Sequence, residues 1–279
     1  MASAAAATAA AAETALHTVG YALVGQLEAS DLPSDEDMAL DPQQRCTIFN
    51  CSDTSLLQPR RTHKRRKTGA SYSAVDAHGD GRRAQTTIRS DTRGWRRFVR
   101  AVRKMLQGAL PHHDLCRDYS CTEYVLIQSK ARCQQQAAHT DYEPSPELRA
   151  AVEGGAGAPQ VPLAMLVALE LGTTLEVWPG SIGAITRRDE AVDAVAAAQA
   201  AHGFGTTQRL ALDVGQVVVF RADLVHAGSA YRGPHRRLHA FWDAHGVPRP
   251  ADTTFLIAET DTTLAKALHL GGGAASCKK

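Results

Sequence analysis

Short apolar runs separated by turn residues dominate the second half of the chain. The runs are rich in β-branched residues and end near glycine or proline, which is typical of short strands. Regularly spaced short strands of this kind predict a sandwich or a barrel. Because only a glycine-containing turn separates 161–171 from 174–178, we expect these two strands to form a hairpin. The predicted strands lie at 17–27, 122–129, 161–171, 174–178, 208–212, 217–220, 237–242 and 254–257.

Helical patterns are fewer. From Trp95 to Leu106 apolar residues recur at helical spacing with arginines between them, which predicts an amphipathic helix. The Ala-rich segment 187–202 predicts a second helix that ends at Gly203, and 262–270 predicts a short last one. The alanines at the N-terminus carry little pattern, so we expect residues 1–16 to form a disordered or weakly helical tail.

Positive charge is concentrated in one segment. Residues 59–104 contain 15 Lys and Arg against 3 Asp and Glu, although the net charge of the whole chain is only +2. Such segregation is typical of nucleic-acid contact, and the run from Arg60 to Lys67 is typical of a nuclear signal. A basic loop and a basic helix face in water explain the same composition, so both interpretations stay open.

Export and membrane insertion are not expected. No apolar run approaches the roughly 20 residues that cross a bilayer. The first basic residue is Arg45, which argues against a secretory signal with a basic start. We therefore expect a cytoplasmic or nuclear protein with reduced thiols. The pairs Cys46/Cys51 and Cys116/Cys121 leave a zinc site as an alternative, although zinc sites usually have tighter C-x2-C spacing.

Three side chains of metal-binding type stand near predicted strand ends. His139 and Asp141 are two residues apart, so on an extended segment they project to the same face. His226 follows the strand at 217–220, and two imidazoles with one carboxylate suit Fe(II) with three positions open. Arg236 and Arg237 open the next strand, where a buried arginine would need an anionic partner.

These motifs together resemble a known superfamily. Four features of the sequence are similar to the Fe(II)/2-oxoglutarate-dependent dioxygenases. They are the run His139-Thr140-Asp141, the distal His226, the segment LVALELGTTLEVWPGS and the segment DLVHAG…RLHAFWD. Within that superfamily, the chain most resembles the phytanoyl-CoA-hydroxylase-like branch and its uncharacterised protist relatives. The likeness covers about 122–243 and leaves out the basic segment 59–90.

The resemblance implies a fold and a set of ligands. The fold class would be α+β, with a double-stranded β-helix core (a jelly roll, cupin-like) and flanking α-helices. His139, Asp141 and His226 would bind Fe(II), with 2-oxoglutarate as cosubstrate and O2 as oxidant. Arg237 would hold the far carboxylate of 2-oxoglutarate, with Arg236 as the alternative. By the strand period Arg237 shares a face with His239 and Phe241, and the spacing from His226 fits either arginine, but the R-L-H-A-F arrangement resembles the family more closely for Arg237.

The implied activity is that of an oxidoreductase. It would decarboxylate 2-oxoglutarate to succinate and hydroxylate or demethylate an unknown substrate, either a small molecule or a macromolecule. The alternative function is a non-catalytic nucleic-acid-binding or scaffold protein that uses the basic segment 59–104. Four residues are candidates for the lining of the substrate pocket: Tyr124, Gln128, Gln135 and Trp178.

The resemblance also suggests how the chain is divided. The core would occupy 91–260 and consist of a helix followed by the double-stranded β-helix, with 17–58 as the N-terminal part of the same catalytic domain. A basic, disordered insertion would fill 59–90. The disordered tail 1–16 and a C-terminal helix and tail at 261–279 would complete the chain.

Overall fold

Two antiparallel sheets face each other and form the centre of the protein. The computed structural model describes residues 4–38, 40–47, 72–73, 82–115, 117–142, 144–154, 159–187, 190–201, 204–247, 249 and 253–256. The larger sheet has the strand order β1 (Tyr21–Gln26), β10 (Gln216–Arg221), β7 (Leu163–Ala168), β12 (His235–Ala244), β5 (Tyr119–Ser129), β4 (Arg83–Ile88) and β2 (Leu40–Thr47). The smaller sheet has the order β3 (Tyr72–Ser73), β13 (Thr253–Leu256), β6 (His139–Thr140), β11 (His226–Gly228), β8 (Thr173–Val177) and β9 (Gln208–Leu212).

The chain passes repeatedly from one sheet to the other. From β5 to β8 each strand lies in the sheet opposite to the strand before it, and the same alternation runs from β9 to β12. Neighbouring strands are antiparallel throughout the described pairings. This winding is that of a double-stranded β-helix, and the predicted α+β fold class is confirmed.

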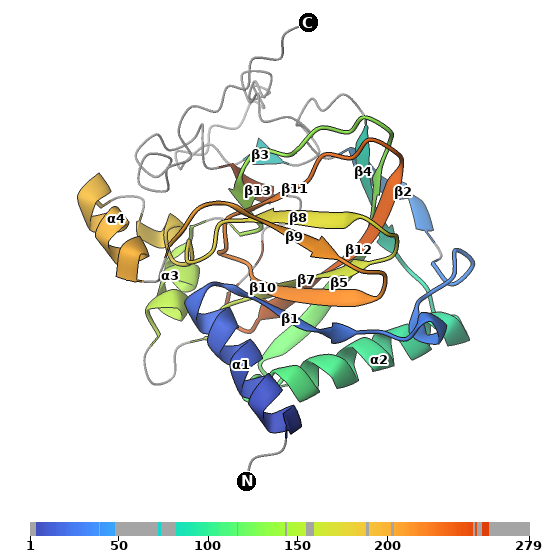
Figure 1. The fold of residues 1–279 in the computed structure, drawn as a ribbon, viewed down its shortest axis with the longest axis horizontal. Helices are drawn as coiled ribbons and strands as arrows, with labels where there is room; N and C mark the ends of the chain where they lie inside the picture. The colour runs from blue at the N-terminus through green and yellow to red at the C-terminus, as the bar shows by residue number, and fades with distance from the viewer. Residues whose placement is uncertain are drawn as a thin grey trace, which may run out of the picture.

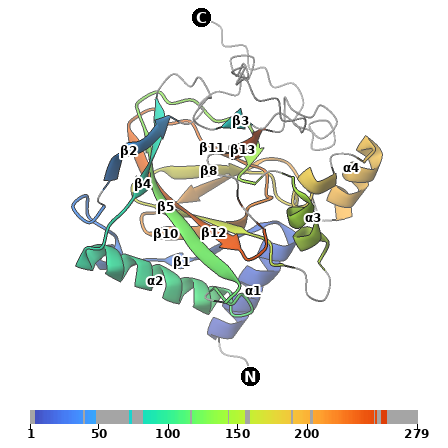
Figure 2. The same cartoon turned by 180° about the vertical axis from the view of Figure 1, so that it is seen from behind.

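Four α-helices flank the sheets. Figures 1 and 2 show α1 (Ala4–Thr18) and α2 (Arg93–Ala109) along the outer side of the larger sheet, whereas α3 (Pro146–Glu153) and α4 (Val192–Ala201) lie at one end of it. Two short 3-10 helices, Ala29–Asp31 and Ile185–Arg187, complete the described secondary structure. None of the helices in the described ranges is long and apolar enough to cross a membrane.

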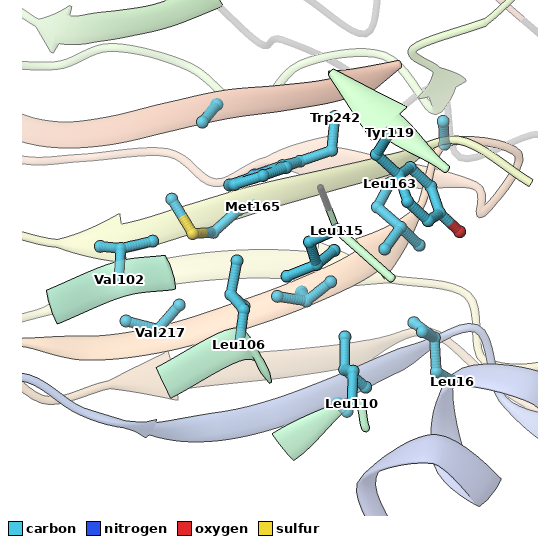
Figure 3. Close-up of a cluster of buried hydrophobic side chains, with 14 of the residues drawn as sticks. Leu16, Val102, Leu106, Leu110, Leu115, Tyr119, Leu163, Met165, Val217 and Trp242 are labelled. Carbon is cyan, nitrogen blue, oxygen red and sulfur yellow. The ribbon is translucent and has the colours of Figure 1, made fainter. Parts of the chain in front are cut away.

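The hydrophobic core has two parts, separated by the larger sheet. One part fills the space between the two sheets, and the other lies between the larger sheet and the helices α1 and α2 (Figure 3) and continues to α3, α4 and the 3-10 helix at Ile185–Arg187. Strand β7 contributes to both, because Ala164, Leu166 and Ala168 face the space between the sheets while the alternate residues face the helices. Because both faces of β7 are buried, its sequence is an unbroken run of apolar residues.

The predicted amphipathic helix is confirmed as α2. Its apolar stripe (Trp95, Phe98, Val102 and Leu106) is buried against the larger sheet. The helix begins where the hydroxyl of Thr92 accepts a hydrogen bond of 3.1 Å from the Trp95 backbone N–H, which satisfies one of its unpaired donors. The arginines of the helix face the solvent.

We expect truncation of Phe98 to test this packing. Phe98 is completely buried, so Phe98→Ala removes a large apolar side chain and leaves a cavity. The free energy of unfolding, measured by urea denaturation, should fall by about 3–5 kcal/mol. The exposed Arg96 on the same helix provides the control, because Arg96→Ala should stay within about 0.5 kcal/mol of the wild type. Equal effects of the two substitutions would contradict the packing.

The expectation of a disordered tail at 1–16 is wrong for the described part. Residues from Ala4 onward form α1, and Ala9, Ala12 and Leu16 are buried at the helical spacing that faces the sheet. Alanine has the highest helix propensity, and its small side chain permits close packing. A run of alanines has no alternation of apolar and polar residues, so the sequence pattern did not indicate the helix.

The predicted insertion at 59–90 is wrong over its last residues. Strand β4 lies within that range and pairs with β5 in the larger sheet. Its core-facing positions include Ala84, Thr86 and Ile88, whose mixed polarity hid the strand. The remainder of the range, including the basic run 60–67, lies outside the described residues except for β3.

Other expectations have mixed outcomes. The proposed hairpin of 161–171 with 174–178 is wrong, because β7 and β8 belong to opposite sheets. The strand predicted at 254–257 is confirmed as β13, and the helix predicted at 187–202 is confirmed in the shorter α4. The segment 261–279 and the cysteines at 51 and 116 lie outside the described residues, so the C-terminal helix and the zinc alternative stay untested.

Candidate metal and anion site

The smaller sheet brings the three candidate ligands together. In the pairing of β6 with β11, His139 and His226 are directly opposite each other. Asp141 follows β6 and lies two residues after His139, on the same side of the extended segment. Residues 87 positions apart in the sequence therefore meet because two short strands are neighbours in the sheet.

The three side chains converge on one point. Each offers one ligand atom, and these atoms all lie within 4.8 Å of one another. His226 Nε2 is 3.5 Å from Asp141 Oδ1, and the two imidazole rings have centroids 4.4 Å apart. All three residues are buried, with exposed fractions of 3–7%. Three ligands of this type in one buried position can hold a divalent metal ion.

The backbone fixes the orientation of both histidines. His139 Nδ1 lies 2.7 Å from the carbonyl oxygen of Ala137, and His226 Nδ1 lies 3.0 Å from that of Leu224. A carbonyl only accepts hydrogen bonds, so Nδ1 carries the proton and donates in each ring. The lone pair is then on Nε2, which is the arrangement in which metal-binding histidines usually occur.

Protonation also favours metal binding. Burial, and after it the neighbouring His226, lower the pKa of His139 to about 3, so its ring is neutral at pH 7. Burial raises the pKa of Asp141, but the imidazoles of His226, His239 and His139 outweigh that effect and hold the pKa below its ordinary value. Neutral imidazole and carboxylate are the forms that bind metal. Asp141 Oδ2 has no hydrogen-bond partner within the described residues, which a metal ligand would explain.

The two arginines at the start of β12 have separate surroundings. Arg237 is buried, and its Nη1 donates a 3.1 Å hydrogen bond to the hydroxyl of Tyr231, whereas its Nε has no partner in the described part of the chain. Arg236 points to the other side, where it is half-buried and pairs with Glu170 at 2.7 Å and Asp35 at 2.6 Å. Of the two, Arg237 is the one that is buried between the sheets, and no residue in the described ranges offers it a carboxylate.

Strand geometry relates Arg237 to the triad. His239 follows it by two residues on the same face of β12, about 7 Å further along the strand. The Nε2 atom of His239 is 3.8 Å from Asp141 Oδ2. Arg237 therefore lies on the face of β12 that His239 turns toward Asp141.

Several residues near the site were missed in the sequence. His239 is fully buried between Phe220 and Phe241, and its pKa is lowered to about 4, chiefly by burial. Gln136 is buried and accepts a 2.9 Å hydrogen bond from the backbone N–H of Gly228. His239 could have been found, because the alternation along β12 puts it on the same face as Arg237. Nothing in the local sequence indicates that Gln136, rather than Gln134 or Gln135, is the buried glutamine.

Two of the four predicted pocket residues lie away from the triad. Tyr124 packs its ring against Trp95 at 5.3 Å on the helix side of the larger sheet, so its assignment to the pocket is wrong. Gln128 is the strand partner of Arg236 and shares its side of the sheet, so it too is misplaced. Trp178 is half-buried, and its backbone N–H donates to the carbonyl of Val225, beside His226, at 3.0 Å; Gln135 is half-buried, so both stay predictions. Strand alternation decides the first two cases.

Comparisons with known proteins give distant structural matches alone. No family model and no curated protein matches the chain. AviO1 from Streptomyces viridochromogenes Tue57 is 16% identical, with a TM-score of 0.48 over 86% of this chain and 97% of its own. HygX from Streptomyces hygroscopicus, solved with nickel and 2-oxoglutarate, is 13% identical, with a TM-score of 0.45 over 84% and 87%. A Pseudomonas putida prolyl-4-hydroxylase is 12% identical, with a TM-score of 0.42 over 85% and 100%.

The phytanoyl-CoA-hydroxylase-like branch stays a prediction. At these identities and scores no reaction, ligand or residue role is transferred from the matched structures. What the chain does is therefore inferred from its own double-stranded β-helix and from the residues inside it.

Proposed function

We propose that the protein is a non-haem Fe(II)/2-oxoglutarate-dependent dioxygenase. The observation that carries the proposal is the buried convergence of His139, Asp141 and His226 within 4.8 Å. Two imidazoles and one carboxylate suit Fe(II) and leave room for further ligands on the metal. The backbone contacts of both Nδ1 atoms support the same conclusion, because they keep each Nε2 available to the metal.

Arg237 supports 2-oxoglutarate as the cosubstrate. A buried guanidinium without a carboxylate partner is costly, and a planar fork of N–H donors fits a carboxylate. In our proposal Arg237 holds the far carboxylate of 2-oxoglutarate while the triad holds the metal at the other end. Tyr231 orients the guanidinium through the Nη1 hydrogen bond.

The chain's residues have separate roles in the proposed reaction. When bound, Fe(II) supplies the oxygen chemistry that couples decarboxylation of 2-oxoglutarate to hydroxylation or demethylation of the substrate. The triad fixes the position of the metal, and Arg237 orients the cosubstrate. Phe220 and Phe241 pack beside His239 and exclude water from this region of the site.

The direct test is release of succinate by the purified full-length chain. We expect succinate to form only when Fe(II), 2-oxoglutarate and O2 are all present, at least as slow turnover without a substrate. If no succinate forms and the chain instead binds DNA or RNA with an affinity that falls steeply with salt, the alternative of a non-catalytic nucleic-acid-binding protein is supported. The exposed arginines of α2 belong to the basic segment that this alternative uses.

The neighbouring arginines give the next prediction. Arg237→Met should raise the KM for 2-oxoglutarate by about 10- to 100-fold, since a hydrogen-bonded charge pair contributes about 1.5–3 kcal/mol. Arg236→Met should leave that KM within about twofold, because its partners are Glu170 and Asp35 on the other side of the sheet. Steady-state succinate assays measure both values. An increase confined to Arg236→Met would exchange the roles of the two residues.

A further inference from the structure

Arg83 on β4 is the second fully buried arginine of the interior. Its exposed fraction is 0%, and its donors are held by neutral acceptors. The Nη2 group donates to the Ser229 carbonyl at 2.7 Å and to the Gln134 carbonyl at 3.0 Å, and Nη1 donates to Gln136 Oε1 at 3.0 Å. The Nε and Nη2 groups also lie 3.3 and 3.0 Å from the Sγ of Cys133.

The guanidiniums of Arg83 and Arg237 come close together beside Gly228. A Cβ atom built on Gly228 would lie 2.0 Å from Arg83 Nη1 and 2.6 Å from Arg237 Nη2. The two nitrogens are therefore no further apart than the sum of those distances. Strands β4, β11 and β12 thus place two positive charges almost in contact, at a position where the chain has no side chain.

No described acidic residue neutralises this pair. The ion pairs found among the described residues include neither Arg83 nor Arg237. Burial, and after it the charge of Arg237, lower the pKa of Arg83 to about 10, which expresses the cost of holding two like charges in the interior. Two buried cations in contact require an anion between or beside them.

We propose that Arg83 and Arg237 form a two-guanidinium clamp for the far carboxylate of 2-oxoglutarate, which makes Arg83 a second cosubstrate-binding residue. The inference rests on the proposed function. It adds a residue from β4, far outside the stretch of chain that carries the triad. A carboxylate has two oxygens that each accept more than one hydrogen bond, so the fork of Arg237 and the remaining N–H of Arg83 Nη1 can share it.

A purely structural role for Arg83 makes a different prediction. Its contacts join β4 to the segment 133–136 and to Ser229, so it also connects the larger sheet with the strands that carry the histidines. In that case its loss would lower stability without changing the affinity for a dicarboxylate. Affinity and stability must therefore be measured separately.

The experiment is titration of the metal-free full-length protein, kept in chelator, with 2-oxoglutarate, followed by calorimetry and thermal unfolding. The wild type should bind it in the absence of metal. Arg83→Met should weaken the affinity by about 10- to 100-fold, and Arg83→Lys should weaken it less, because lysine keeps the charge but loses the fork. In succinate assays with metal, Arg83→Lys should raise the KM for 2-oxoglutarate more than it lowers kcat.

Gln136→Glu is the second variant, in case Arg83→Met does not fold. A glutamate oxygen can accept the same hydrogen bonds from Arg83 and Gly228, but it also brings a negative charge to the clamp. The proposal expects this internal anion to weaken 2-oxoglutarate binding by about tenfold or more.

The outcomes separate the clamp from the proposed function. If Arg237→Met loses affinity while folded Arg83→Met and Gln136→Glu bind like the wild type, the clamp is overturned and the dioxygenase remains. If the wild type binds no 2-oxoglutarate with or without metal, the proposed function fails as well. Weakened binding in the Arg83 and Gln136 variants at unchanged metal affinity supports the clamp.

Discussion

Replacing His226 by alanine is expected to abolish metal binding and turnover. Loss of a group that hydrogen-bonds to a metal ligand lowers metal affinity by about 10–100-fold, so removal of a ligand itself should lower it by more than about 100-fold. His226 is buried, so no water-exposed side chain can replace it without a rearrangement of β6 and β11. The measurement is equilibrium titration of the chelator-treated protein with Co(II), together with succinate release under Fe(II).

His245 provides the matched control for this substitution. It is exposed, lies beyond the end of β12, and its backbone N–H bonds to the carbonyl of Asp118, a contact that alanine retains. We expect His245→Ala to bind Co(II) and to release succinate as the wild type does. Co(II) binding by a folded His226→Ala protein at wild-type affinity would exclude His226 as a ligand and remove the main support for the proposed function.

Much of the candidate site was predictable because its residues follow simple spacing rules. His139 and Asp141 share a face through the two-residue period of a strand, and the same period separates Arg237 from Arg236. Histidine and aspartate at strand ends stand out against an apolar background. The resemblance to the oxygenase superfamily indicated that His139, Asp141 and the distal His226 belong to one site. In the structure, the pairing of β6 with β11 brings the two histidines together.

The parts that could not be predicted depend on long-range pairing. Arg83 lies in a segment whose basic composition suggested a mobile loop, yet β4 pairs with β5 and buries it. No local pattern distinguishes one buried arginine among many exposed ones. The exchange of strands between the sheets likewise separates β7 from β8, although their sequences suggested a hairpin.

Gly228→Ala is expected to damage the site more than any other substitution of similar size. Its Cβ would lie 2.0 Å from Arg83 Nη1, 2.2 Å from Gln136 Oε1 and 2.6 Å from Arg237 Nη2. These groups end flexible side chains, but Arg83 is enclosed and held by several hydrogen bonds, so it cannot move without breaking them. Overpacking of this kind costs about 1–3 kcal/mol of stability.

We expect Gly228→Ala to reduce succinate release more strongly than it reduces the stability of the fold. A shift of about 1 Å in a binding group can lower the rate about 100-fold, and here both guanidiniums and the Gln136 amide must shift together. We therefore expect succinate release under limiting 2-oxoglutarate to fall by about 100-fold or more, while Co(II) affinity, which depends on the triad, changes far less.

Gly233 is the control, because it lies on the connection that leads from β11 to β12 and a Cβ there would meet nothing within 4 Å. Gly233→Ala should keep both the affinity for 2-oxoglutarate and the melting temperature close to those of the wild type. If Gly228→Ala also kept the wild-type affinity for 2-oxoglutarate and the wild-type melting temperature, the two guanidiniums would have room to separate. Binding of the carboxylate would then not depend on their close approach. The backbone conformation of Gly228 is one that other residues also adopt, so it does not by itself require glycine. A loss of 2-oxoglutarate affinity in Gly228→Ala alone would therefore mean that glycine is needed there to leave space for the charged groups.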